Sequence, residues 1–347
     1  MPIGTVTREQ LQSLPKTDLH VHLDGSLRPH TMIELARELG VLLPASDPAS
    51  LAAYMNVSEG RGLVDYLARF DITLSLMQTV EAIERIAFEL AADAAADNVR
   101  YMEVRFCPGL NTRGGLAPDA VVDAALNGLR RAEVEHEITT AVIICALRNL
   151  PVSAAIEMAE LAVAYKHRGV VGFDLAGAEH GHPPVEHKVA FQLVAEANLA
   201  ITVHAGEAYG PASIHQALHH CHARRIGHAT RLWEDQELMG FVNDFRVPLE
   251  ICLTSNVQTQ ATTSLEDHPL RTFYDQGLVV SLNTDNRLMS GTTVTDELMR
   301  AHEALDFEWD ELCELAIMGF ESAFLPQQER AALVAAVQEE ISGLHEA

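Results

Sequence analysis

Eight short runs rich in β-branched residues alternate with longer stretches of helical periodicity, and this alternation limits the folds open to the chain more than any other feature. The runs cover residues 17–23, 99–106, 142–147, 170–175, 200–204, 225–228, 247–253 and 278–283. Strands connected by helices form parallel sheets, so eight such units predict a closed (β/α)8 barrel, the TIM barrel. An open doubly wound sheet is less favoured, because no glycine-rich dinucleotide-binding motif follows the first run.

Two segments of the sequence show helical patterns and no clear strand pattern. Residues 24–97 carry helical patterns, and an insertion at this point would lie over one mouth of the barrel, where lids are found. The alternative is that the segment only buries one end of the core. Helical patterns at 295–305, 309–320 and 327–344 predict the last barrel helix and a C-terminal cap. We therefore expect one barrel domain over residues 1–347, with 24–97 as a helical, lid-like insertion.

Composition excludes several classes of partner. The 347 residues carry a formal net charge of −25, which repels phosphate backbones and anionic lipids. Nucleic acids and membrane surfaces are therefore not expected partners. The five cysteines are scattered and form no C-x-x-C pair, which is typical of a reducing compartment. We find no signal-peptide pattern and no membrane-spanning stretch, so we expect a cytoplasmic protein.

Polar side chains follow several of the predicted strands at the point where each strand ends. They are His20 and His22 toward the end of the first run, His204 and Glu207 at and just after the end of the fifth, His228 at the end of the sixth, and Asp285 with Asn286 just after the eighth. In a (β/α)8 barrel the catalytic groups come from these strand ends. Three imidazoles and a carboxylate suit Zn²⁺, or less often Fe²⁺, with one position left open for water. For His20 and His22 alone, a pair of hydrogen-bonded core histidines is an equally good interpretation.

The other histidines have simpler interpretations. His215, His219, His220 and His222 are expected on one solvent-facing helix, and His180 and His182 at the rim of the barrel. Those in helical or connecting segments are interpreted as structural: His30, His136, His167, His187, His268, His302 and His345.

Six segments, in order, resemble the signature motifs of the adenosine deaminase family. They are PKTDLHVHLDGSL at 15–27, MEVRF at 102–106, DLAG at 174–177, HAGE at 204–207, RIGH at 225–228 and SLNTD at 281–285. The resemblance extends from about Pro15 to about Asp296. It implies a (β/α)8 metallohydrolase that holds one catalytic Zn²⁺ per chain and acts on a purine nucleoside.

Each motif residue has a role that the resemblance implies. His20, His22, His204 and Asp285 would be metal ligands, and Glu207 would donate a proton to the purine ring. His228 would orient and polarise the activated water. Asp24 and Gly177 would contact ribose and purine. His22 and Asn286 would also lie against the substrate, and Asp285 would count among the catalytic groups.

Two positions depart from the family pattern. Asn286 replaces a frequent second aspartate, whose carboxyl is thought to donate a hydrogen bond to purine N7; an amide can donate there without being protonated. Ala229 replaces a glycine after His228, which is expected to affect packing more than chemistry.

The sequence thus predicts a zinc-dependent aminohydrolase that converts adenosine, and 2′-deoxyadenosine, to the inosine product and ammonia. The main alternative keeps the chemistry and changes the substrate to a modified adenine nucleoside such as 6-aminofutalosine, or to free adenine. Hydrolysis of a phosphoester or amide would call for a lysine at a strand end, and none is found there. A nucleoside-binding protein without catalysis is a further alternative, against which Glu207, His228 and Asp285 argue. The oligomeric state stays open.

Overall fold

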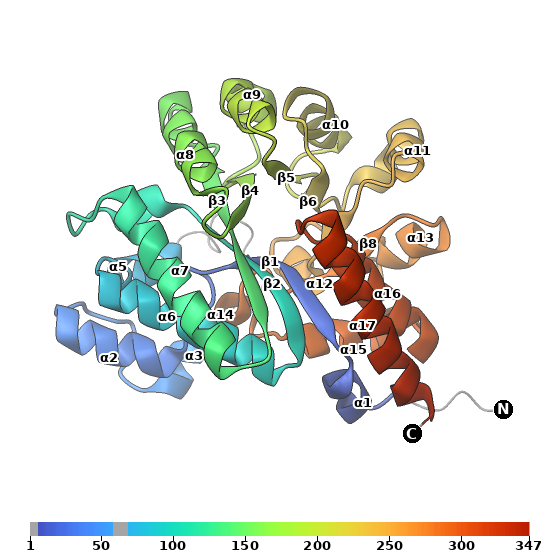
Figure 1. Ribbon diagram of the computed structural model, residues 1–347, viewed down its shortest axis with the longest axis horizontal. Coiled ribbons are helices and arrows are strands. Elements are labelled where there is room, and N and C mark those ends of the chain that lie inside the picture. The colour runs from blue at the N-terminus through green and yellow to red at the C-terminus, as the bar shows by residue number, and fades with distance from the viewer. Residues whose placement is uncertain (1–5, 58–68, 347) are drawn as a thin grey trace.

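The computed structural model describes residues 6–57 and 69–346 and shows eight parallel strands that follow one another around a barrel (Figure 1). The strands are β1 (Lys16–His22), β2 (Val99–Phe106), β3 (Thr139–Leu147), β4 (Val170–Ala176), β5 (Ala200–Ala205), β6 (Arg225–His228), β7 (Leu249–Ile251) and β8 (Val280–Leu282). Each strand pairs with the next in parallel register. The predicted (β/α)8 barrel is confirmed, and β7 and β8 are shorter than expected.

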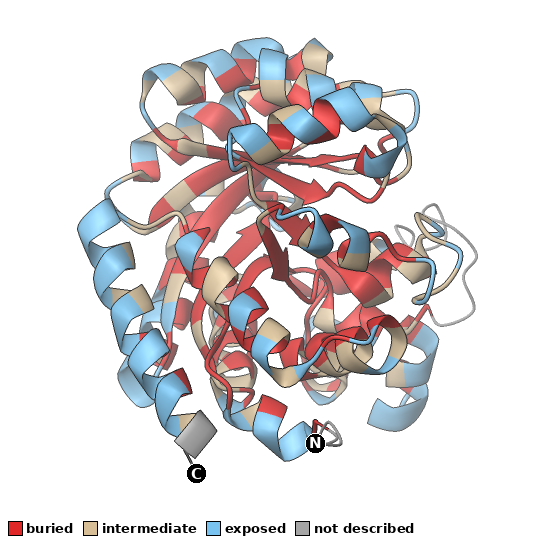
Figure 2. Ribbon diagram, turned by 90° about the vertical axis from the view of Figure 1, so that its right-hand side faces the viewer, coloured by how far each residue is buried: buried red, intermediate tan, exposed pale blue. Residues whose placement is uncertain are grey.

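Helices surround the strands. The α-helices are α1 (Arg8–Ser13), α2 (Pro29–Leu39), α3 (Pro48–Met55), α5 (Phe70–Leu76), α6 (Val80–Ala96), α7 (Pro118–Glu135), α8 (Val152–Tyr165), α9 (Lys188–Glu196), α10 (Pro211–His220), α11 (Gln236–Asp244), α12 (Leu253–Gln258), α13 (Leu270–Asp275), α14 (Arg287–Ser290), α15 (Val294–Leu305), α16 (Trp309–Glu321) and α17 (Gln327–Glu346). Short 3₁₀ turns are η1 (Pro108–Asn111), η2 (Pro184–His187) and η3 (Leu232–Glu234). Figure 2 shows buried strands inside and helices with one exposed face outside. No described helix is long and apolar enough to cross a membrane.

Sequence signals explain where many of these helices begin. Proline occupies the first turn of α2, α3, α7 and α10, where its missing N–H leaves no unmet bond. Helix α1, which we did not predict, starts with a capping box in which Thr7 and Gln10 bond to each other's backbone N–H. The Lys16 ammonium donates to the carbonyl oxygens of Leu11, Gln12 and Leu14 and so fastens α1 to the start of β1.

The first and last strands meet through a seam made by ligand-bearing segments and by side chains. An isolated parallel bridge joins Val21 to Asp285, with His22 N–H donating to Asp285 O and Asp285 N–H donating to His20 O. At the residues that precede this bridge, the Asn283 side chain accepts from Leu19 N–H, and the Asp18 carboxylate accepts from the N–H and the hydroxyl of Thr284. Helix α16 packs across β1 and β8, and α17 packs on α16 as the expected C-terminal cap.

The segment expected as a lid-like insertion, 24–97, contains α2, α3, α5 and α6. Helix α6 packs against β2 and α7 in the way a barrel helix does. The earlier part reaches the barrel mouth, because Val57 N–H donates to Met289 O in α14 and the Phe70 ring lies 6.5 Å from the His22 ring. Residues 58–68 of the segment lie outside the part that the structure describes.

Candidate metal centre

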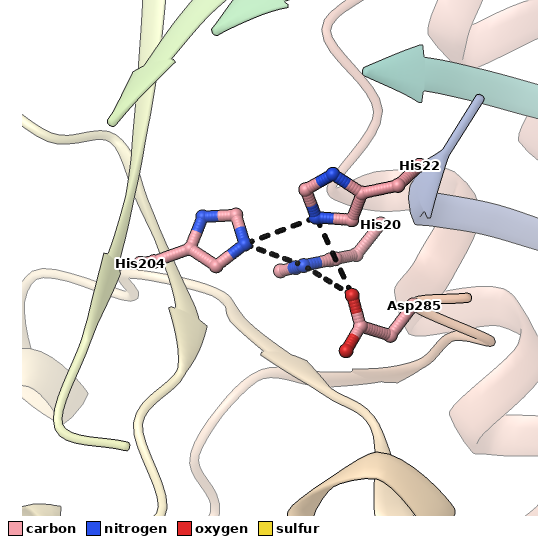
Figure 3. Close-up of side chains that lie close together, drawn as sticks. All are labelled: His20, His22, His204 and Asp285. Atoms are coloured by element: carbon pink, nitrogen blue, oxygen red, sulfur yellow. Dashed lines mark hydrogen bonds and ion pairs between the residues drawn. The ribbon is translucent and has the colours of Figure 1, made fainter. Parts of the chain in front are cut away.

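Four side chains from three strand ends converge at the mouth of the barrel: His20 and His22 from β1, His204 from β5 and Asp285 after β8 (Figure 3). The Nε2 atoms of His20 and His22 lie 3.1 and 3.2 Å from His204 Nε2, and 3.5 and 3.4 Å from Asp285 Oδ1. Metal–ligand bonds of about 2.0–2.1 Å place tetrahedral ligand atoms about 3.3 Å apart, so this spacing fits a metal of the size of zinc.

The proton positions also favour a cation in this cluster. His20 Nδ1 is 2.8 Å from the Glu250 carboxylate and His204 Nδ1 is 2.9 Å from that of Asp174, so both Nδ1 atoms carry protons. Their Nε2 lone pairs then converge, while Asp285 Oδ1 is buried without a hydrogen-bond partner. Burial lowers the pKa of His204, but the Asp174 carboxylate outweighs this and the net shift is upward.

A buried ion network holds the two carboxylates that orient these histidines. The Arg105 guanidinium donates to Asp174 at 3.0 Å and to Glu250 at 2.9 Å, and all three side chains are fully buried. Glu250 also accepts from Thr202 and from Arg225. Carboxylates that accept the second N–H of a ligating imidazole set its orientation and raise its basicity. Arg105 thus connects Asp174, which orients His204, to Glu250, which orients His20.

Glu207 follows β5 in a loop held by one buried carboxylate. Glu179, which comes after β4, accepts four successive backbone N–H groups, from Gly206, Glu207, Ala208 and Tyr209, at 2.6–3.0 Å. The Glu207 carboxylate is consequently held toward the barrel mouth, with Oε2 3.8 Å from His228 Nε2. We did not single out Glu179 from the sequence, although its position two residues after DLAG was the available signal.

His228 lies over the ligand cluster without belonging to it. Its ring centroid is 4.8 Å from that of His20 and 5.1 Å from that of His204. The backbone is left-handed at His228, Ala229 and Asp285, with φ between 54° and 65°. Such conformations are uncommon for residues with a side chain and concentrate at functional sites.

The expected substrate contacts surround the same mouth. Asp24 lies in the turn after β1, its Oδ1 is buried without a partner, and burial raises the pKa of this carboxyl to about 7. Asn286 Oδ1 is also buried without a partner and packs so closely on Gly25 that a Cβ there would approach it to 1.6 Å. Gly177, with φ of 93°, is at the end of β4. Asp24 lies 4.0 Å from His22, and Asn286 directly follows Asp285, whereas Gly177 is placed only by its strand; the contacts of all three with substrate stay predictions.

Comparison with known proteins decides the family. The sequence model described as "Adenosine deaminase" matches residues 15–340. This chain belongs to the adenosine deaminase family. A family relative from Mycobacterium sp. (strain JLS), "Adenosine deaminase", is 43% identical over 347 residues, with 95% of each chain covered. The resemblance inferred from the motifs is thus confirmed, and the chain is a metal-dependent hydrolase of this family.

Solved structures of family relatives with other named substrates share the fold. An adenine deaminase from Arthrobacter aurescens has a TM-score of 0.88 at 30% identity, covering 95% of this chain and 99% of that one. The N6-methyl-AMP deaminase of Arabidopsis thaliana has a TM-score of 0.84 at 30% identity, covering 96% and 98%. Family membership therefore fixes the type of reaction more firmly than the substrate.

The other histidines are placed mostly as expected. His215, His219 and His220 share α10, whereas His222 lies beyond its end with φ of 58°, so the expected four-histidine helix is wrong in that residue. His268, interpreted as structural, is 3% exposed and bonds to Asn256, which in turn bonds to His228. Its connection to the site depends on tertiary contacts that no local pattern reveals.

Proposed function

We propose that this protein deaminates adenosine, and 2′-deoxyadenosine, by hydrolysis, releasing ammonia and the inosine product. The observation that carries the proposal is the convergence of His20, His22, His204 and Asp285 beside Glu207 and His228, in a chain of the adenosine deaminase family. The 43% identity to a relative named adenosine deaminase favours adenosine over other adenine compounds.

The metal proposed for the site is zinc, one per chain, because three imidazoles and one carboxylate at this spacing suit it. Bound there, zinc would lower the pKa of water toward about 7 and so supply the nucleophile. The oxygen of the water would add to C6 of the purine, and the amino group would leave as ammonia after gaining a proton that the added water gives up.

The side chains of this chain carry the remaining steps. Glu207 would give a proton to the ring nitrogen beside C6 as that carbon becomes tetrahedral. His228 would hold the added oxygen by a hydrogen bond. Asp24 and Gly177 would contact ribose and purine, and the Asn286 amide would donate to N7. His22 lies on the open side of the cluster, with 11% of its side chain exposed, so it would border the substrate as well.

The insertion is proposed to act as a lid over this site. Support comes from Phe70, whose ring faces His22, and from Val57, whose N–H is bonded to α14 directly after the segment carrying Asp285 and Asn286. We also propose a cytoplasmic location, because all five cysteines are buried and unpaired in the described structure.

The test is a steady-state comparison of adenosine, 2′-deoxyadenosine, adenine and 6-aminofutalosine by ammonia release. The highest kcat/KM is expected for adenosine. If adenosine is inert while another compound is turned over, the reaction class stands and the substrate proposal fails. Glu207→Ala should retain the metal and lose turnover; unchanged turnover with metal bound would refute the assigned chemistry.

A further inference from the structure

A chain of hydrogen bonds leads from the start of α13 to His228. The backbone N–H of Leu270 donates to His268 Nδ1 at 3.1 Å. His268 Nε2 is 3.2 Å from Asn256 Oδ1, and Asn256 Nδ2 is 2.9 Å from His228 Nδ1. The three side chains are buried, with exposures of 3%, 0% and 1% for His268, Asn256 and His228. Water therefore does not compete for these bonds.

The backbone N–H of Leu270, at one end of this series of hydrogen bonds, determines which group donates in every bond of the series. An amide N–H can only donate, so His268 Nδ1 must accept and the His268 proton must be on Nε2. That N–H donates to the Asn256 carbonyl oxygen, which turns the Asn256 NH₂ toward His228. His228 Nδ1 must then accept, which leaves the His228 proton on Nε2.

Other proton positions in this series of hydrogen bonds are excluded because each would leave a buried donor without an acceptor. Rotating the Asn256 amide by 180° would bring its NH₂ against the His268 N–H, donor against donor, in a buried place where an unmet donor costs about 1–3 kcal/mol. Charging His268 would remove the lone pair that Leu270 N–H uses. Burial, with a smaller effect from His228, lowers the pKa of His268 to about 3, so its ring is neutral near pH 7.

We propose that Asn256 and His268 are positioning residues that hold His228 as the Nε2–H tautomer, with the protonated nitrogen facing the reaction site. His228 Nε2 is the atom that lies 3.8 Å from Glu207 Oε2, at the rim of the ligand cluster. His228 therefore presents a hydrogen-bond donor to the substrate side. The role of this donor rests on the proposed function: it would stabilise charge on the oxygen that adds to C6, and it would not accept a proton from that oxygen.

The tautomer can be read directly in the metal-loaded wild-type enzyme. Long-range ¹H–¹⁵N NMR of protein labelled with ¹⁵N-histidine distinguishes a protonated from an unprotonated ring nitrogen, and a His228→Ala spectrum identifies the signal. We expect His228 to show a protonated Nε2 and an unprotonated Nδ1. A protonated Nδ1 in the wild-type protein overturns the proposal, whether or not adenosine is a substrate. Failure to turn over adenosine with the expected tautomer present overturns the proposed function alone.

Asn256→Asp tests the relay with almost no change of shape. A carboxylate still accepts from His268 but has no N–H for His228, so it draws the His228 proton to Nδ1 and leaves Nε2 as an acceptor. We expect kcat to fall by about 10²-fold while KM and metal content change little, since the loss of one preorganised hydrogen-bond donor to a developing oxyanion costs about 10²–10³ in kcat. An unchanged tautomer and kcat would contradict the proposal.

Two further variants separate the relay from general loss of stability. Asn111→Asp makes the same substitution at another buried amide, whose Nδ2 donates to Met77 O at 2.9 Å. It should lower the unfolding midpoint and leave the His228 tautomer unchanged. His268→Gln keeps a donor for Asn256 Oδ1, so the Nε2–H tautomer and most of kcat should remain. Loss of the tautomer in Asn111→Asp, or its retention in Asn256→Asp, counts against the relay.

Discussion

His22 and Asp24 are only two positions apart, and we propose separate functions for them in this site. His22 Nε2 is within 3.4 Å of two other candidate ligand atoms, whereas Asp24 Oδ1 lies 4.0 Å from His22 Nδ1 and is buried without a hydrogen-bond partner. His22 would therefore bind the metal, and Asp24 would contact the substrate. The strand ends between them, which is why alternation along β1 does not carry through to Asp24.

This division predicts opposite effects for two alanine variants. His22→Ala should lose most of the bound metal, because one of four converging ligands is removed. Asp24→Ala should keep the metal and raise KM for adenosine by about tenfold or more, since a lost hydrogen bond to a charged group is worth about 1.5–3 kcal/mol. Metal analysis of the purified variants beside steady-state kinetics measures both. Metal loss in Asp24→Ala would move that residue into the ligand set.

At the scale of elements, the loop between β5 and α10 is shaped by a side chain from a different βα unit. Glu179 binds four consecutive N–H groups of this loop, and the loop carries Glu207 only three residues after the ligand His204. Successive amides that point inward make a concave anion site. Here the anion is the Glu179 carboxylate, which therefore links the loop after β4 to the loop after β5.

Glu179→Gln should loosen that loop. An amide has one acceptor oxygen, so at least one of the four N–H groups would face an NH₂, at a cost of about 1–3 kcal/mol in the free energy of unfolding. We expect kcat to fall, because the loop that carries Glu207 is less firmly held. The metal should remain, because Asp174 and Glu250 still orient the histidine ligands. Urea unfolding and metal analysis check this; the surface variant Glu186→Gln, at the exposed end of the same connection, should change neither quantity.

Over the whole molecule, buried charges connect the strands from inside the barrel. Arg105 on β2 joins Asp174 on β4 to Glu250 on β7, and Arg225 on β6 extends the network to Glu103 on β2. A buried charge that loses its partner is costly, so the network is stable only when complete. The same carboxylates orient two metal ligands, which couples the stability of the barrel to the geometry of the site.

Arg105→Leu should therefore affect stability and metal affinity together. Leaving Asp174 and Glu250 without their shared partner should cost about 3–5 kcal/mol of unfolding free energy. Disturbed support of His20 and His204 should weaken metal binding by about 10–100-fold, measured by chelator competition. Arg168→Leu breaks an exposed ion pair with Asp123 and should change stability by less than about 1 kcal/mol. Equal effects of the two variants would contradict the coupling.

The strands and the convergence of the four candidate metal ligands could be predicted because both depend on local patterns. A buried parallel strand is a short apolar run, and a polar residue near its end stands out, as His204 does in β5. The groups behind the ligands could not be found this way. Glu250 is a buried charge within an apolar run, and its pairing with His20 depends on the register of strands that are distant in sequence. His268 could not be found from the sequence for the same reason, since only tertiary contacts connect it to His228.

The closure of the barrel also determines when the metal can be held during synthesis of the chain. His20 and His22 are translated before Asp285, yet their backbones bond to it. The earlier ligands are therefore translated long before the segment that completes both the seam and the ligand set. A metal at this site should then be fully held only after β8 and Asp285 have been translated, and a nascent chain that stops before β8 should bind the metal weakly.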